Sequence, residues 1–224
     1  MSFKSTRWHG VAVTVHAALA ENAGPARNMP LYQAAVDYQA GPWRAGYAGL
    51  LAKPDRASAT VRENVSYHNV YLNYRYGSGT LYAAAVRSNN ATNSTNGLTA
   101  GTILSNTGDP SNHFAGTDPN ARRYFNIWQL SADYRASPRL RIGMLYGRIR
   151  DTSGGNAGAS GGNIGAYYAL SARTTLYGFA NRLRNERNGG FRFLGSAGPG
   201  NNLAGDDVNG RKLTGIQAGI LHKF

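Results

Sequence analysis

The final stretch of the chain, residues 212–224, most restricts what the chain can fold into. Read with a period of two, it places Ile216, Ile220 and Phe224 on one face and Gln217 and Lys223 on the other. This is an amphipathic strand that ends on an aromatic residue. Its backbone groups need neighbouring strands, and a closed β-barrel provides them. The alternative is an ordinary edge strand that ends at Phe224 by chance.

Length and composition indicate one large all-β domain over residues 1–224. The chain is 42% hydrophobic and 16% charged, and its mean hydropathy is −0.42. No run approaches the roughly 18 apolar residues that a membrane-spanning helix needs, so any spanning segments must be strands. The 29 Gly and 14 Tyr favour closely packed strands with interfacial aromatic residues. Because there is no Cys, we expect no disulfide and no thiolate metal site. We also expect no cofactor.

The charge balance is strongly basic, with 24 Lys and Arg against 11 Asp and Glu and a net charge of +13. Such a balance suggests that the partner could be nucleic acid or an anionic membrane. The basic residues are scattered singly or in pairs, without a basic run or a recognisable RNA or DNA motif. A basic pore lining explains this spread better, and we expect no nucleic-acid partner.

Two interpretations compete for residues 11–20. Lys4 and Arg7 before an apolar segment, with Ala18-Leu19-Ala20 as a cleavage site, are typical of a secretory signal peptide. Alternatively, residues 1–20 form a strand end, a turn and a strand whose Val residues face outward and whose Thr14 and His16 face inward. We favour the strand because a polar residue interrupts the apolar segment twice.

Further strands follow in hairpins whose connections are alternately short and long. We expect them over residues 31–40, 43–53, 66–76, 80–88, 124–135, 140–150, 163–170, 175–183 and 212–224. With residues 11–20 this makes about ten strands, and bacterial single-chain barrels have an even number. The sequence therefore predicts an antiparallel up-and-down transmembrane β-barrel.

Several segments resemble those of a known family. Tyr134-Arg-Ala-Ser-Pro-Arg-Leu140, Tyr168-Ala-Leu-Ser-Ala-Arg-Thr-Thr-Leu-Tyr177 and residues 215–224 resemble the turns and the closing strand of Gram-negative general porins. Residues 5–10 resemble another turn more loosely, because Thr6 stands where the family usually has Pro. The resemblance implies an outer-membrane protein through which small hydrophilic solutes diffuse, and no enzyme. It also implies that Phe224 is part of the signal read by the barrel-assembly machinery.

Members of this family are trimers of sixteen-stranded barrels, and the chain resembles their carboxy-terminal part. The resemblance therefore implies that about six strands and the constriction loop would precede Met1. Because the family builds its trimer contacts largely from early strands, a homotrimer is doubtful for this chain. About ten strands enclose little more than side chains. We expect either a strained small barrel or a curved sheet with a gap between its first and last strands.

Strand alternation selects the charged residues that we expect to face the lumen. They are Arg44, Arg75, Arg87, Arg135, Arg141, Arg182, Lys223, Asp37 and Asp133. Their positive excess predicts a preference for small anions, because fixed charges in a wetted pore select which ions enter. The alternative is that they are solvated strand residues that have no role in the function.

Outward aromatic residues are expected to form girdles at the membrane interfaces, with core packing as the alternative. They are Tyr38, Trp43, Tyr74, Tyr76, Trp128, Tyr134, Tyr168 and Tyr177. The five His residues show no metal-ligand spacing.

Two other functions stay open at this stage. One is a small outer-membrane barrel enzyme with catalytic residues in its loops, for which the candidates are Asp109, Asp118, Asp206, Asp207 and His113. The other is a soluble β protein that binds polyanions. In that case a second sheet would have to cover the apolar stripes.

Overall fold

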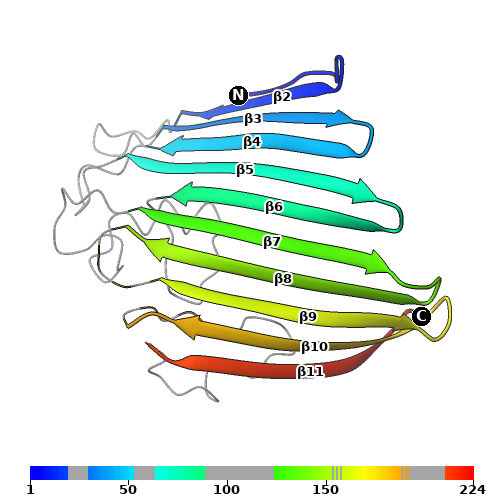
Figure 1. Cartoon of the computed structure of the whole chain (residues 1–224). Coiled ribbons are helices and arrows are strands. Elements are labelled where there is room, and N and C mark those ends of the chain that lie inside the picture. Colours follow the sequence, from blue (N-terminus) through cyan, green and yellow to red (C-terminus); the bar gives the residue numbers. More distant parts are fainter. Residues whose placement is uncertain are drawn as a thin grey trace.

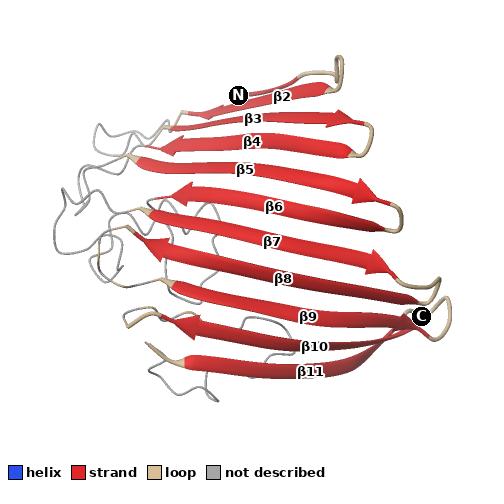
Figure 2. Cartoon of the chain, in the orientation of Figure 1, coloured by secondary structure: helices blue, strands red, loops and turns tan. Residues whose placement is uncertain are grey.

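A computed structural model of the chain describes residues 1–19, 30–52, 64–88, 124–152, 154, 156, 158–187, 189, 191 and 210–224. Every regular element in these ranges is a β-strand (Figure 2). The strands are β1 (Ser2–Lys4), β2 (Val11–Ala18), β3 (Leu31–Ala40), β4 (Trp43–Ala52), β5 (Val65–Tyr76), β6 (Gly79–Ser88), β7 (Phe125–Arg135), β8 (Leu140–Asp151), β9 (Ala159–Ala169), β10 (Thr174–Asn185) and β11 (Lys212–His222). Within the described ranges there is no helix long and apolar enough to cross a membrane.

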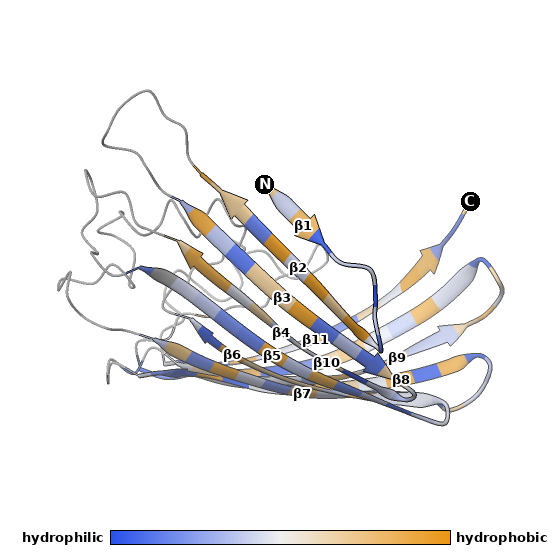
Figure 3. Ribbon diagram, turned by 90° about the horizontal axis from the view of Figure 1, so that it is seen from above, coloured by the Kyte–Doolittle hydropathy of each residue, from blue (hydrophilic) through white to orange (hydrophobic). Residues whose placement is uncertain are grey.

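The strands form one antiparallel sheet in which each strand pairs with the next along the chain (Figure 1). Seen from above, the sheet is a curved trough whose two edge strands, β1 and β11, lie on the same side of it (Figure 3). Each of these edge strands pairs with one neighbour only, as far as the described residues go. The up-and-down all-β fold is therefore confirmed. Of the two expected forms, the curved sheet with a gap is the one observed.

The segment for which two interpretations competed forms a strand in the structure. Residues 11–18 pair with β3 along their whole length, and residues 14–16 also pair with β1. A tight turn precedes them, in which His9 and Gly10 have φ values of 44° and 84°. Two consecutive residues in the left-handed region are typical of the hairpin turns that match strand twist. At Gly10 a Cβ atom would also lie 2.6 Å from the Gln39 carbonyl oxygen, so this position requires glycine.

The start of β9 differs from the prediction by four residues. The Gly-rich segment from Ala159 was expected to be a loop, but it pairs with β8 and β10 from that residue onward. Gly161, for example, lies between Gly147 and Leu183. Full backbone pairing on both sides stabilises a segment whose composition alone is typical of a loop.

The sheet has two chemically distinct faces. Directly opposed residues of antiparallel strands lie on the same face, so the pairing places Leu130, Met144, Ile164 and Ile216 together on what we call the apolar face. These side chains are 51–85% exposed. Along β3, β8 and β11 the alternate residues, on the polar face, are mostly less exposed. Side chains converge on the inside of a curve, so the polar face is the concave one.

Aromatic side chains on both faces lie over glycines of neighbouring strands. On the polar face, Phe179 occupies the space that a Cβ atom at Gly165 would need, and Tyr177 does the same at Gly219. Tyr177 was expected to face outward, and that prediction was wrong. Because β10 carries apolar residues on both faces, its alternation does not identify the outward face. The glycines beside Tyr177 and Phe179 leave room for large rings on the polar face.

The other predicted girdle residues lie on the apolar face, and several of them lie close to another aromatic ring. Trp43 and Tyr74 have ring centroids 4.3 Å apart. Trp128 and Tyr146, nearer the loop end, are 5.4 Å apart. Such amphipathic rings suit the level of lipid headgroups.

Candidate pore surface

The polar face carries two clusters of charged side chains, each built around one carboxylate. Asp37 lies on β3 opposite Gly46 of β4, and Asp133 lies on β7 opposite Gly143 of β8. Glycine at the opposing position leaves room beside each carboxylate for other side chains. Both Asp side chains are 20% exposed. They therefore remain in contact with solvent.

The first cluster surrounds Asp37. Its Oδ1 atom accepts hydrogen bonds from Nε of Arg44 at 2.7 Å and from the Tyr71 hydroxyl at 2.5 Å. Its other oxygen forms an ion pair with Arg7. Arg7 also donates to the Gly10 carbonyl at 2.6 Å. Tyr71 belongs to β5 and reaches Asp37 across β4. It can do so because Gly46 has no side chain, and a Cβ atom there would occupy the place of the Tyr71 ring.

The second cluster surrounds Asp133 at the turn end of the sheet. Its Oδ2 atom accepts from Nη2 of Arg141 at 3.0 Å and from the Tyr82 hydroxyl at 2.9 Å. Arg75 and Arg135 line the same pocket of about 440 Å³ together with these residues. Three guanidinium groups thus share a pocket that contains one carboxylate.

The two clusters together are positively charged. Five guanidinium groups, those of Arg7, Arg44, Arg75, Arg135 and Arg141, lie around two carboxylates, which leaves an excess of three positive charges. The side chains of Arg44 and Arg141 stay 55% and 58% exposed although both are paired. Water and small ions can therefore reach these cations.

Most of the predicted lumen residues lie on the polar face. Arg44 opposes Gln39, Arg75 opposes Thr80, and Arg135 opposes Arg141, all at positions that alternate with the apolar face. Lys223 follows the end of β11 and continues the polar-face alternation. Its amide donates to the Arg173 carbonyl at 2.9 Å. Arg7 was not predicted, because it lies in a turn where strand alternation gives no information.

Arg87 and Arg182 lie on the apolar face, so their predicted inward orientation was wrong. Arg87 opposes His68, two pairs along the strands from Val70 and Ala85 and therefore on the same face. Its guanidinium carbon lies 4.5 Å from the centroid of the Tyr124 ring. Arg182 opposes Gly162, two pairs along the strands from Ile164 and Ala180 and therefore also on that face. Both residues stand near the loop ends of their strands, where a charge on the outer face can reach the membrane surface.

The described residues contain no group of three or more His, Asp or Glu that could hold a metal ion. His68 forms a hydrogen bond of 2.7 Å between its Nδ1 atom and the Tyr47 hydroxyl, on the apolar face. The loop residues that an enzyme would need lie outside the described ranges. They are Asp109, Asp118, Asp206, Asp207 and His113.

A sequence profile of the family described as Gram-negative porin matches residues 1–189. The chain belongs to the Gram-negative porin family. Its place is therefore the outer membrane, as the sequence predicted, with outer-membrane lipid around the apolar face. No curated protein matches this porin.

Two solved structures are similar to this chain, and the first of them shares its fold. A porin structure refined at 1.8 Å resolution superposes with a TM-score of 0.61 and 10% identity, covering all of this chain and 60% of that one. OmpTdeltaL8, a loop L8 deletion mutant of OmpT, an outer membrane protein of Vibrio cholerae, gives a TM-score of 0.48 and 11% identity over 81% of this chain and 55% of that one. This porin thus spans about 60% of the length of the first structure.

Proposed function

We propose that this porin contributes the wall of a water-filled diffusion channel that passes small hydrophilic solutes and prefers anions to cations. The supporting observation is the excess of three positive charges in the two solvent-accessible clusters on the concave polar face. Arg44, Arg75, Arg135, Arg141 and Lys223, with Asp37 and Asp133, would line this lumen. Phe224 would serve the barrel-assembly machinery.

The excess positive charge attracts mobile anions and raises their local concentration. A unit charge roughly 7 Å from an ion in water contributes about 0.6 kcal/mol, or a factor of two to three in local concentration before salt screening. Three uncompensated charges act in the same direction. Preference for anions follows without a binding site, because a channel needs its fixed charges to attract ions but not to hold them.

Neither of the other functions has an observation in its favour. A soluble polyanion-binding protein would have to cover its apolar face, and the described strands all belong to one sheet. Porins are channel proteins, and we propose no enzyme activity.

Reversal potentials across a planar bilayer with a salt gradient test this proposal in a complete barrel that contains these strands. Replacing Arg75 and Arg141 by Gln should reduce the preference for anions. The matched control replaces Arg87 and Arg182 by Gln, which removes the same charge from the apolar face and should leave the reversal potential unchanged. Cation preference in the parent protein, or equal shifts for the two double variants, would contradict the proposal.

A further inference from the structure

The concave polar face carries three aromatic rings in mutual contact on β9 and β10, which the attraction of small ions does not use. They are Tyr167, Tyr177 and Phe179, and we call them the ring cluster. The centroid of the Tyr167 ring lies 5.3 Å from that of Phe179 and 6.2 Å from that of Tyr177. The centroids of Tyr177 and Phe179 are 5.5 Å apart. The ring cluster therefore adds an apolar surface to the wall of the proposed lumen.

Packing over glycines accounts for two of these rings and not for the third. Phe179 covers Gly165 and Tyr177 covers Gly219, so both rings fill space that a glycine leaves. The Tyr167 ring is not among the nearest neighbours of any described glycine, and Tyr167 stays 46% exposed. A tyrosine that fills no gap in the sheet is available to contact a solute.

The ring cluster adjoins the cations of the second charged cluster. The pairing places one row across four adjacent strands, which consists of Arg135, Arg141, Tyr167 and Tyr177. Arg141 pairs with Asp133 and its side chain stays 58% exposed, whereas no carboxylate of the described residues forms an ion pair with Arg135. Two guanidinium groups that an anion can reach thus stand beside exposed rings.

Open space lies between these cations and the rings. The neighbouring row of the polar face consists, in strand order, of Asp133, Gly143, Gly165 and Phe179. Apart from its chain neighbours, a Cβ atom at Gly143 would meet only the Ala132 carbonyl oxygen within 4 Å, at 3.6 Å, among the described residues. The ion pair of Asp133 with Arg141 stands on the β7 side of this space and the Phe179 ring on the β9 side. Strands β7 and β9 are about 10 Å apart, which leaves room for one six-membered ring.

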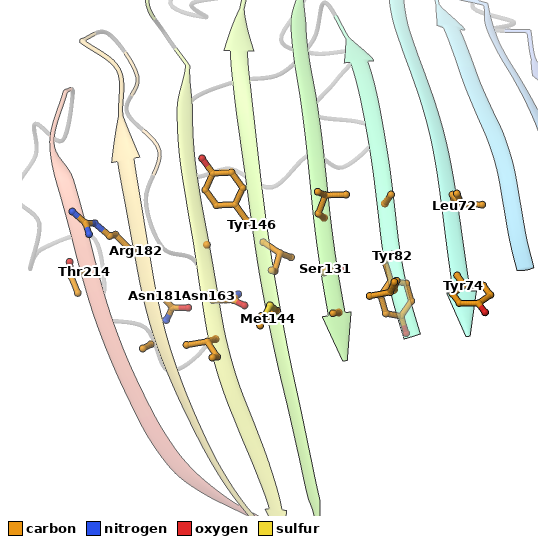
Figure 4. Close-up of a pocket in the computed structure, with 18 of the residues that line it drawn as sticks. Leu72, Tyr74, Tyr82, Ser131, Met144, Tyr146, Asn163, Asn181, Arg182 and Thr214 are labelled. Atoms are coloured by element: carbon orange, nitrogen blue, oxygen red, sulfur yellow. The ribbon is translucent and has the colours of Figure 1, made fainter. Parts of the chain in front are cut away.

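Neutral amides border the ring cluster on the side of the loops. Asn163 and Asn181 oppose each other on β9 and β10, two residues beyond Gly165 and Phe179 (Figure 4). The guanidinium groups of Arg135 and Arg141 stand on the β8 side instead. This arrangement suits a flat solute that carries its anionic group at one end.

We propose that the space above Gly143 is a weak binding site for small aromatic carboxylates. Arg135 and Arg141 donate hydrogen bonds to the carboxylate, and the ring of the solute packs against the rings of Tyr167 and Phe179. Binding is weak because the site is open to water, and a solute that crosses a channel must also leave it. The inference rests on the proposed channel function and names a solute class for it.

Block of the chloride current by benzoate tests this site in a complete barrel that contains these strands. In planar bilayers with KCl at neutral pH, benzoate should lower the single-channel conductance in a saturable manner. Acetate carries the charge without the ring, and benzamide carries the ring without the charge. Both should need at least about threefold higher concentrations than benzoate for the same block, because each lacks one of the two contacts.

Two successive residues of β9 provide matched variants. Tyr167 lies on the polar face, and Tyr168, which is 41% exposed, lies on the apolar face. Tyr167→Leu should raise the half-blocking concentration of benzoate about threefold to tenfold and leave that of acetate unchanged. Tyr168→Leu should change neither value. Arg141→Gln should weaken the block by benzoate more than Arg44→Gln, which removes the same charge at the first charged cluster.

Three outcomes would overturn the inference. They are a block of the parent by benzoate no stronger than by acetate or benzamide, equal effects of the two Tyr variants, and equal effects of the two Arg variants. The comparison of solutes on the parent needs no variant, so it decides if Tyr167→Leu does not assemble. The KCl reversal potential of the parent tests the proposed anion preference separately, and the block measurements decide the aromatic site whichever ion the parent prefers.

Discussion

The hydrogen bond between Tyr71 and Asp37 gives the sharpest test of how the polar face is held together. It joins β5 to β3 across β4, and it depends on the glycine at position 46. A hydrogen bond to a charged group contributes roughly 1.5–3 kcal/mol. The ion pairs of Asp37 with Arg7 and Arg44 contribute less, about 1 kcal/mol or below each, because the two Arg side chains are 39% and 55% exposed.

Asp37→Asn should therefore lower the free energy of unfolding by about 2–3 kcal/mol. Tyr71→Phe removes one donor and should lower it by about 1–2 kcal/mol. Since the two residues share a hydrogen bond, the double variant should lose less than the sum, with a coupling energy of about 1–1.5 kcal/mol. Urea unfolding of a complete barrel that contains these strands, in phospholipid vesicles and followed by tryptophan fluorescence, measures all three values.

Asp133 provides the matched control for this cycle. It bonds Tyr82 and Arg141 and makes no hydrogen bond with Tyr71. Asp133→Asn and Tyr71→Phe should add to within about 0.5 kcal/mol. If the coupling of Tyr71 with Asp37 were no larger than its coupling with Asp133, the cross-strand bond would not contribute to stability and the reasoning would fail.

Two further predictions follow from the packing and the sheet edges. Gly165→Val should destabilise the sheet by about 1–3 kcal/mol, because the new side chain takes the place of the Phe179 ring. Gly178→Val is the control, since a Cβ atom there meets nothing closer than a carbonyl oxygen at 3.8 Å, and equal losses for both would contradict this. The 224-residue chain reconstituted by itself should give no long-lived porin-sized conductance steps in planar bilayers. Its described edge strands β1 and β11 do not pair with each other, and such steps would show that the strands close or that chains combine.

Strand positions were largely predictable from this sequence because period-two patterning and turn residues agree. The bounds of β3, Leu31 and Ala40, are those predicted from the alternation of Tyr32, Ala34, Val36 and Tyr38 before Gly41-Pro42. The start of β9 was not predictable in the same way. Its first residues are small or polar, and they form a strand because β8 and β10 supply hydrogen-bond partners. That is tertiary information, which local patterning does not contain.

The faces of the arginines were harder to predict than the strands. Strand alternation gave the correct face for Arg44 and Arg141, whose strands have a clear apolar side. It gave the wrong face for Arg87 and Arg182, because β6 and β10 carry apolar residues on both sides. The cross-strand pairs Val70–Ala85 and Ile164–Ala180 identify the apolar face of β6 and β10. A charge near the end of a strand therefore says little about which side is the lumen.

Depth along the strand explains why arginine is tolerated on both faces of this sheet. On the outer face, an arginine at the bilayer midplane costs about 2–4 kcal/mol, and the cost falls almost to zero at the interface. On β8 the residues Ile142, Met144 and Tyr146 occupy the apolar face before Arg148 and Arg150 begin at the loop end. On the concave face Arg141 lies near the turn end and is still solvated. Arginine is thus tolerated on the concave face where water reaches it, whereas on the outer face of the described strands it stands only near the loop ends.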